Sequence, residues 1–310
     1  HYHHGLVALT NSLVAAGFRG DVVAGYRGPL PAWAEHGTAA PLPAWPQARA
    51  LAVAPGVQLR FVPLSTTDHL TNHKPEFMLA LLDGGAGPCR ALYYLDPDIC
   101  IAQRWRFFEE WVQCGVALCE DMNSALPERH PRRMGWRRFY GHRGLPLRFR
   151  MGEYVNGGFV GLRQEDREFL LTWQRAMTLM SEEIGGLASA KIEGGRGFRS
   201  KGFADCFDCS DQDALNAAVE ASACEVSVIG QEAMGFKPGA LLLPHAVGRG
   251  KPWERFYLRA ALGGRAPGAA DKAFWQHVAG PLCSHGAWSR ACHRLDLRAA
   301  SAIGRVLRRA

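Results

Sequence analysis

Two carboxylates stand two residues apart at the end of an apolar run, in the sequence YYLDPD at residues 93–98. In a strand, residues i and i+2 project to the same side, so Asp96 and Asp98 can face one ligand together. Open α/β sheets bind ligands at the carboxyl ends of their strands. Two hard oxygen donors there suit Mg²⁺ or Mn²⁺, which complete their coordination with phosphate oxygens and water. Taken alone, the motif also fits a turn, because Asp and Pro are frequent turn residues.

A second group of chemically capable residues lies in the sequence HAVGRGKPW at residues 245–253. The neutral imidazole of His245 can act as a third metal ligand. Lys251 can reach a diphosphate, and Gly248 lets the backbone approach an anion closely. The alternative interpretation is a surface loop that carries a histidine and a lysine.

Two shorter motifs are DQDALN at residues 211–216 and NGGF at residues 156–159. The acids of the first motif have an ordinary explanation, because they complement the dipole at the start of a helix. Gln212 has no such explanation. In the second motif Asn156 precedes two glycines, which permit either close approach of a ligand or a bulge, and a turn is the alternative.

The four motifs follow one another between residues 93 and 253, and together they resemble the family-8-type glycosyltransferases of the GT-A fold, in the nucleotide-diphospho-sugar transferase superfamily. The His-x-x-Gly-x-x-Lys-Pro-Trp and Asp-Gln-Asp-x-x-Asn patterns are the specific parts. An Asp-x-Asp pair is common to many unrelated transferases. The resemblance covers residues 1–256 and leaves out the C-terminal tail.

The resemblance implies a metal-dependent hexosyltransferase that retains anomeric configuration and uses a UDP-sugar donor with Mn²⁺ or Mg²⁺. The positions that match the family's metal ligands are Asp96, Asp98 and His245. Those that match its donor-binding residues are Lys251, Gly248, Asn156, Lys74 and Tyr2. The catalytic candidates beside the donor sugar are Asp211 and Gln212.

The expected chemistry agrees with these roles. Cleavage of the bond between the anomeric carbon and the diphosphate leaves negative charge on the leaving group, which a dication and Lys251 would stabilise. The sequence places no carboxylate clearly as a covalent nucleophile. We therefore favour attack from the same face, assisted by the departing phosphate.

The elements that position these residues alternate between helices and strands, which indicates an α/β domain with a mixed, mostly parallel sheet flanked by helices. We predict helices at residues 5–17, 74–82, 165–180 and 211–221, with Ser210 as N-cap of the last. We predict strands at residues 21–26, 57–64, 90–95, 115–119, 154–162, 226–229 and 240–243. The GT-A domain is assigned to residues 1–265 and a basic helical tail to residues 266–310. In the family a first strand precedes the helix that here begins near Tyr2, so we expect that strand to be missing from this chain.

The composition narrows the class of protein. Of the 310 residues, 47% are hydrophobic and 21% are charged, which excludes a disordered chain, a coiled coil and a collagen. No apolar run reaches the roughly 18–20 residues that a membrane-spanning helix needs. Nine cysteines in a chain of this size argue for a reducing compartment, so we expect a cytoplasmic protein. The Cys206–Cys209 pair lacks the second pair of a structural zinc site.

The formal charge of +7 is unevenly placed. Residues 126–150 carry a net +7 and residues 290–310 a net +5, so the rest of the chain is acidic. Solvated loops are one explanation. The alternative that we predict is an anionic glycan or lipid-linked acceptor facing the first segment, through Arg132, Arg133, Arg137 and Arg138. For the tail we predict peripheral contact with the anionic inner membrane face, through Arg294, Arg298, Arg305, Arg308 and Arg309. No recognised nucleic-acid module accompanies these residues, so no nucleic acid is expected.

Two alternatives to a transferase remain open at this stage. One is a catalytically weak nucleotide-sugar-binding or scaffold protein of the same fold, against which the intact metal ligands and Gln212 count. The other is an Asp-x-Asp phosphohydrolase with an aspartyl nucleophile. Such enzymes usually carry Thr or Val two residues after the second Asp, where this chain has Cys100, and their motif lies earlier in the domain.

Overall fold

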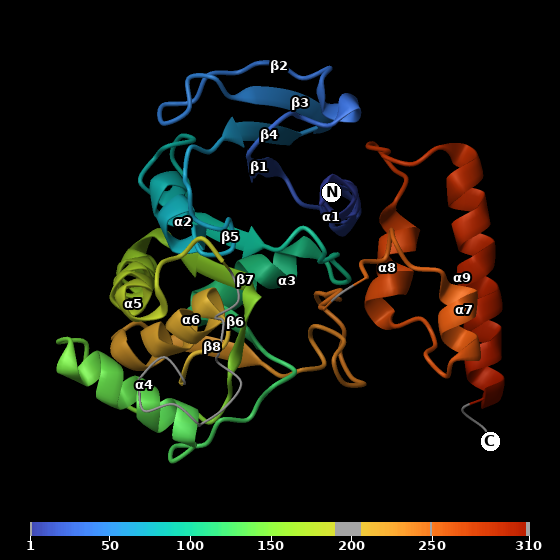
Figure 1. Ribbon diagram of the computed structural model, residues 1–310. Coiled ribbons are helices and arrows are strands. Elements are labelled where there is room, and N and C mark those ends of the chain that lie inside the picture. Colours follow the sequence, from blue (N-terminus) through green and yellow to red (C-terminus); the bar gives the residue numbers. More distant parts are fainter. Residues whose placement is uncertain (1, 190–205, 249, 308–310) are drawn as a thin grey trace.

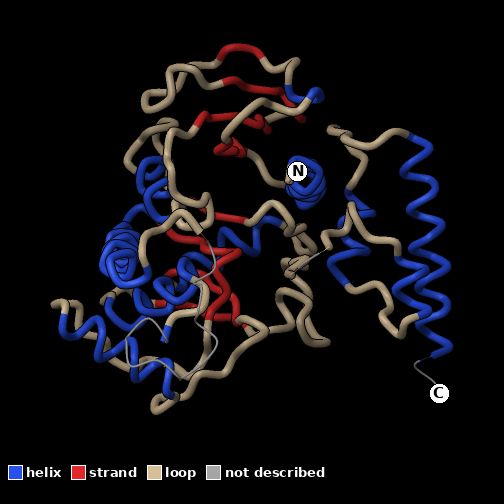
Figure 2. Tube along the Cα trace, viewed as in Figure 1, coloured by secondary structure: helices blue, strands red, loops and turns tan. Residues whose placement is uncertain are grey.

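The computed structural model describes residues 2–189, 206–248 and 250–307. Two four-stranded sheets lie one above the other and are flanked by helices, and a group of C-terminal helices stands to one side (Figure 1). Figure 2 shows the same arrangement by element type, with the first sheet at the upper edge and the second sheet among the helices.

The first sheet comes from residues 20–63. Its strands are β1 (Gly20–Tyr26), β2 (Thr38–Ala39), β3 (Arg49–Ala54) and β4 (Val57–Pro63), in the spatial order β1-β4-β3-β2. A short 3₁₀ turn, η1 (Ala32–Ala34), precedes β2. Gly56 has φ 74°, a left-handed conformation that glycine adopts without strain, and it closes a tight turn between β3 and β4. These two strands are therefore antiparallel, whereas β1 runs parallel to β4.

The second sheet carries the acid-rich strand ends. Its strands are β5 (Ala91–Leu95), β6 (Val116–Glu120), β7 (Val155–Arg163) and β8 (Val226–Ile229), in the order β5-β7-β6-β8. β7 pairs antiparallel with both β5 and β6, and β8 runs parallel to β6. The mixed α/β architecture is confirmed. The expectation of mostly parallel pairing is wrong. Among the described strands, β1 with β4 and β6 with β8 pair in parallel, whereas the other four pairs are antiparallel.

The second sheet is buried on both faces by helices. The strand period of two places Val116 and Leu118 in one hydrophobic cluster, which α2, α4, α5 and α6 complete. Ala117 and Cys119 belong to a second cluster, with residues of α1 and α3. The helices and 3₁₀ turns of this body are α1 (His3–Ala16), α2 (Lys74–Leu82), α3 (Trp105–Trp111), η2 (Val112–Cys114), α4 (Pro131–His142), η3 (Gln164–Asp166), α5 (Arg167–Ile184) and α6 (Ser210–Ala221).

The C-terminal helices are fixed to the main body through α1. They are α7 (Tyr257–Leu262), α8 (Ala269–His277) and α9 (Ala287–Leu307), and α8 lies between α1 and α9 (Figure 1). A hydrophobic cluster joins Ala8 of α1 to Phe274 and Trp275 of α8 and to Ala300 of α9. Asn11 donates from Nδ2 to the carbonyl oxygens of His277 and Leu282 at 2.8 and 2.9 Å. A domain boundary at residue 265 stays a prediction.

Several element predictions need correction. Residues 240–243 form no strand, and their backbone instead bonds Ala233 and Ala102. Strand β3 is absent from the sequence predictions, because alanine at alternate positions gives it little strand propensity. Cys209, and not Ser210, is the N-cap of α6, while the Ser210 hydroxyl donates to Asn72 Oδ1 at 2.5 Å. None of the nine cysteines, all of which lie in the described part of the chain, is joined in a disulfide. None of the described helices combines the length and the apolar character that a membrane span requires.

Candidate metal site and its surroundings

Asp96, Asp98 and His245 come together at the end of β5. Each offers one ligand atom, and these atoms all lie within 4.8 Å of one another. His245 Nε2 is 3.3 Å from Asp98 Oδ1 and 3.8 Å from Asp96 Oδ2. Octahedral Mg²⁺ binds oxygen at about 2.1 Å, so opposite ligands of one ion stand about 4.2 Å apart. The spacing and the donor types, two carboxylates and an imidazole, therefore fit a single Mn²⁺ or Mg²⁺.

Backbone contacts from three elements hold these ligands in place. The Asp96 N–H donates to the carbonyl of Gly158 in β7 at 2.8 Å, and Ala246 N–H donates to the Asp98 carbonyl at 3.1 Å. A Cβ at Gly158 would lie 2.5 Å from His245 Cε1, so glycine is needed there for the imidazole to reach the acids. A Cβ at Gly5 would likewise collide with the Pro97 carbonyl, because α1 packs directly on the turn between the two acids.

Lys251 supplies positive charge beside the candidate metal ligands. Its Nζ lies 2.5 Å from Asp98 Oδ2 and donates to the Ala246 carbonyl at 2.8 Å. Burial on its own would raise the pKa of Asp98, but His245 and Lys251 outweigh burial and hold that pKa below its ordinary value. Gly248 has φ 82° in the same loop. The half-exposed Tyr2 ring lies 5.7 Å from Lys251 Nζ, so the structure brings both predicted donor-binding residues together.

Lys74 is buried between the candidate metal ligands and the catalytic candidates. Its buried Nζ is 2.8 Å from Asp211 Oδ2, 2.8 Å from the Gly157 carbonyl and 3.3 Å from Asp96 Oδ1. Burial on its own would lower the pKa of Lys74. The carboxylates of Asp211 and Asp96 raise this pKa by more than burial lowers it, so it lies well above its usual value. The ammonium is therefore charged, and its three N–H groups face three acceptors of the protein itself. Direct contact between Lys74 and a donor stays a prediction.

The DQDALN motif divides into a part that faces the site and a part that holds α6. Gln212 Oε1 accepts a hydrogen bond from Gly157 N–H at 3.0 Å, beside Asp211. Asp213 instead accepts from the Tyr154 hydroxyl at 2.6 Å, and Asn216 pairs with both backbone groups of Val155. Asp213 and Asn216 therefore fix α6 against the start of β7. This contact places Asp211 and Gln212 next to the two glycines of β7.

Asp121 is a site residue that the sequence analysis missed. It is buried directly after β6, and its Oδ2 accepts from Asn156 Nδ2 at 2.6 Å. Asn156 Oδ1 in turn accepts from Gly158 N–H at 2.8 Å, so Asp121 fixes the orientation of the asparagine amide. Asp96 likewise follows a strand, but Asp121 has no second acid two residues away, so its sequence pattern is weaker.

The prediction that four arginines of residues 126–150 face an anionic acceptor is wrong for the buried Arg133, and it stays a prediction for Arg132 and Arg137, which are partly exposed and ion-paired. Arg133 is buried and ion-paired with Glu220, and Arg137 Nε lies 3.2 Å from the same carboxylate. Arg132 Nη2 lies 2.7 Å from Asp213. These positive charges neutralise buried acids of α6, some 80 residues later in the chain, which the local charge count could not reveal. Arg138 is exposed.

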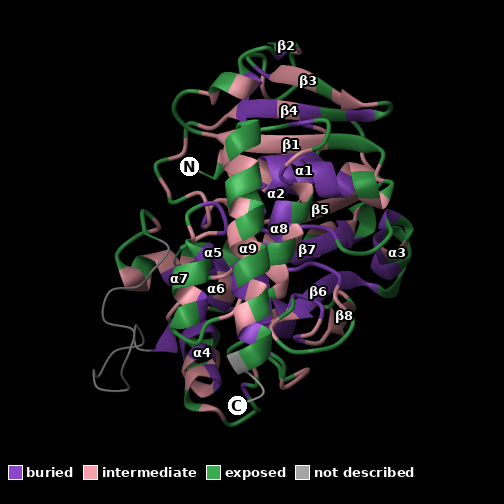
Figure 3. Cartoon of the chain, turned by 90° about the vertical axis from the view of Figure 1, so that its right-hand side faces the viewer, coloured by how far each residue is buried: buried purple, intermediate pink, exposed green. Residues whose placement is uncertain are grey.

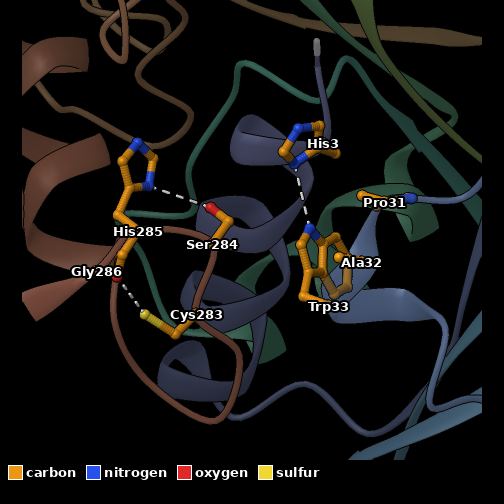
Figure 4. Close-up of a pocket in the computed structure, with 8 residues that line it drawn as sticks. All are labelled: His3, Pro31, Ala32, Trp33, Cys283, Ser284, His285 and Gly286. Atoms are coloured by element: carbon orange, nitrogen blue, oxygen red, sulfur yellow. Dashed lines mark hydrogen bonds between the residues drawn. The ribbon is translucent and has the colours of Figure 1, made fainter.

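A separate pocket of about 580 Å³ lies beyond the first turn of α1. His3 and Trp33 stand on one side of it, and Cys283, Ser284 and His285 stand on the other (Figure 4). The Ser284 hydroxyl is hydrogen-bonded to Nδ1 of His4 at 2.9 Å and to Nδ1 of His285 at 3.2 Å. Burial and neighbouring positive charges lower the pKa of His4 and of His285 to about 4, so both rings are neutral at pH 7.

No family model and no curated protein matches the sequence. Solved structures do match. The galactosyltransferase LgtC, in complex with donor and acceptor sugar analogs, superimposes with a TM-score of 0.51 at 15% identity, over 94% of this chain and 96% of that chain. An active-site mutant of LgtC gives a TM-score of 0.51 at 15% identity, over 93% and 95% of the two chains. The described chain therefore has the GT-A glycosyltransferase fold of LgtC, which confirms the fold that the sequence motifs implied.

Proposed function

We propose that this protein is a metal-dependent hexosyltransferase that moves a sugar from a UDP-sugar to a glycan or lipid-linked acceptor in the cytoplasm, with retention of anomeric configuration. One observation carries the proposal. Asp96, Asp98 and His245 converge at the end of β5 with Lys251 beside them, on a fold shared with a galactosyltransferase.

The donor set supports the metal and the diphosphate. Asp96, Asp98 and His245 would hold Mn²⁺ or Mg²⁺, which supplies positive charge to the diphosphate of the donor. Lys251 reaches the same place from the loop that carries His245, and its ammonium adds charge where the leaving group becomes more negative. Tyr2 offers an exposed aromatic ring next to Lys251, which suits the nucleobase end of the donor.

The donor sugar is assigned to the surface formed by Asn156, Gly157 and Gln212. Glycine at residue 157 lets the Asp211 carboxylate and Gln212 approach β7 closely, because a Cβ there would lie 2.8 Å from Asp211 Oδ2. The Asp211 carboxylate is paired with the Lys74 ammonium, which weakens it as a nucleophile. This pairing favours attack from the same face over a covalent glycosyl-enzyme, and it leaves Gln212 as the polar group nearest to a sugar bound over the glycines.

The test combines turnover with metal binding. The purified chain is incubated with a panel of nucleotide sugars with Mn²⁺ or with a chelator, and released UDP is measured. We expect UDP release with Mn²⁺ that falls at least about 100-fold in the Asp96→Asn, Asp98→Asn double variant. Mn²⁺ binding by isothermal titration calorimetry should be lost in the same variant.

A matched control removes two exposed acids elsewhere, Glu109→Gln with Glu225→Gln, and should leave both readouts unchanged. Undiminished UDP release by the Asp96, Asp98 double variant would refute the metal-dependent mechanism. Donor and Mn²⁺ binding without turnover over many acceptors would instead indicate the nucleotide-sugar-binding protein of the same fold.

A further inference from the structure

Helix α9 exposes an apolar ridge along its whole length. The ridge consists of residues at alternating spacings of four and three, so they line one side of the helix: Trp288, Cys292, Leu295, Ala299, Ala302 and Val306. All six are exposed, and the three largest side chains retain 82%, 65% and 69% of their accessible surface, for Trp288, Leu295 and Val306. The opposite side of the helix packs on the protein through Ala300 and Leu297. Exposed apolar surface of this extent marks a contact with another phase or molecule.

A band of arginines runs beside the apolar ridge. Arg294, Arg298 and Arg305 follow at spacings of four and seven, are all exposed, and lie along one edge of the ridge. The single acid of the helix, Asp296, points elsewhere, because its carboxylate accepts from the backbone N–H groups of Tyr257 and Leu258 at 2.7 and 2.9 Å. The outer side of α9 is therefore apolar along one strip and cationic along the next.

The neighbouring helix α7 adds further exposed apolar side chains. Phe256, just before α7, is 75% exposed, and Leu262 at its end is 69% exposed. Figure 3 shows α7 beside the C-terminal half of α9 on the face turned toward the viewer, and Figure 1 shows the two helices side by side.

We propose that this outer side of α9 lies in the headgroup region of an anionic bilayer, with the apolar ridge reaching the acyl chains and the arginine band contacting lipid phosphates. The combination of an apolar strip with flanking arginines is the pattern by which interfacial helices bind such surfaces. A second copy of the chain fits less well. Two ridges packed together would bring arginine bands of the same sign close, and the described outer side of α9 offers no acid to pair with them. Arg308 and Arg309 lie outside the described residues.

The experiment uses the full chain and lipid vesicles in a co-sedimentation assay. One set of vesicles contains equal amounts of phosphatidylglycerol and phosphatidylcholine, and the other contains phosphatidylcholine alone. We expect strong binding to the first set, weak binding to the second, and release from the first by added salt.

The variants separate the ridge from general charge. The triple variant Arg294→Gln, Arg298→Gln, Arg305→Gln should bind anionic vesicles about 100-fold more weakly, at about 5-fold for each arginine near the surface. The ridge variant Trp288→Ser, Leu295→Ser should lose binding without any change of charge. The matched control replaces three exposed arginines of the main body, Arg104→Gln, Arg106→Gln and Arg148→Gln.

The outcomes are distinguishable. An equal loss in the control triple variant would show that overall charge alone drives binding and would overturn the proposal. So would a ridge variant that binds vesicles normally but changes from dimer to monomer in sedimentation velocity, because the ridge would then contact a second copy. UDP release without vesicles and the thermal unfolding of every variant should stay as in the parent chain. Failure of the proposed transferase activity would therefore leave this inference intact.

Discussion

Replacement of Lys74 by methionine tests whether one buried ammonium holds the site together. The substitution keeps the length of the side chain and removes three contacts, to Asp211, Asp96 and the Gly157 carbonyl. It leaves the buried Asp211 carboxylate without its positive partner. Removal of one member of a buried ion pair destabilises a protein by about 3–5 kcal/mol, and two of the lost contacts are charge-assisted hydrogen bonds of about 1.5–3 kcal/mol each. We therefore expect a loss of about 4 kcal/mol in the free energy of unfolding at pH 7.

The assay is urea unfolding followed by circular dichroism, at several pH values. In the parent chain the pKa of Lys74 is raised, so its stabilising charge is fully present below pH 10 and is lost only as pH rises through that higher value. In the Lys74→Met variant the uncompensated Asp211 takes up a proton more readily. The deficit should therefore be smaller at pH 5 than at pH 8. The double variant Lys74→Met, Asp211→Asn should recover much of the loss, because it removes the unpaired charge.

The exposed Lys237→Met variant is the matched control and should change stability by less than about 0.5 kcal/mol. A loss below about 1 kcal/mol for Lys74→Met would refute the idea that the ammonium neutralises this site. Strict additivity of the Lys74 and Asp211 substitutions would refute it as well, since it would mean that the two groups do not interact.

Three further predictions concern residues around the site. Gly158→Ala should displace the His245 ring and weaken Mn²⁺ binding about 10-fold or more in a calorimetric titration, whereas Gly141→Ala, with open space around it, should not. Arg133→Met should lower the free energy of unfolding by about 3 kcal/mol in urea and leave acceptor use unchanged, because the arginine is buried against Glu220; a selective loss of acceptor use would contradict this assignment. The pKa values of His4 and His285 lie near 4, below 6.5 for an unfolded histidine, so stability should fall as pH drops from 6.5 to 4. Because both rings are only half-buried, about 1–2 kcal/mol is expected for each, and His285→Asn should flatten this part of the stability–pH curve.

The candidate metal ligands could be predicted from sequence because four motifs in one order resemble a known family, although each motif taken alone also fits a turn or a surface loop. Asp96 and Asp98 end an apolar strand at a spacing of two, and His245 precedes a distinctive Lys-Pro-Trp run. Helix and strand positions with clear periodicity, such as residues 74–82 and 226–229, are confirmed at the predicted bounds. Local pattern is sufficient where the residues that decide a structure are neighbours in the chain.

The errors have the opposite origin, since they depend on partners that are distant in sequence. The sequence near Arg132 and Arg133 predicts exposed positive charge. In the fold, Asp213 and Glu220 of α6 pair with these two arginines and neutralise them. β3 has too little strand propensity to be predicted alone and exists because β4 pairs with it. Asp121 becomes a site residue only when β7 brings the amide of Asn156 to its carboxylate.

The two glycines of the NGGF motif explain how one strand serves two parts of the site. Successive residues of a strand face opposite sides, so Gly157 and Gly158 of β7 open space in two directions. The space at Gly157 is filled by the Asp211 carboxylate, and the space at Gly158 is filled by the His245 imidazole, with distances of 2.8 and 2.5 Å to the Cβ that each glycine lacks. A side chain at either position would push away a different group, the catalytic candidate in one case and the metal ligand in the other. Alanine at residue 157 should therefore impair turnover while Mn²⁺ still binds, and alanine at residue 158 should impair Mn²⁺ binding itself. If both variants lost the same property to the same extent, the division of the site by the two faces of β7 would be wrong.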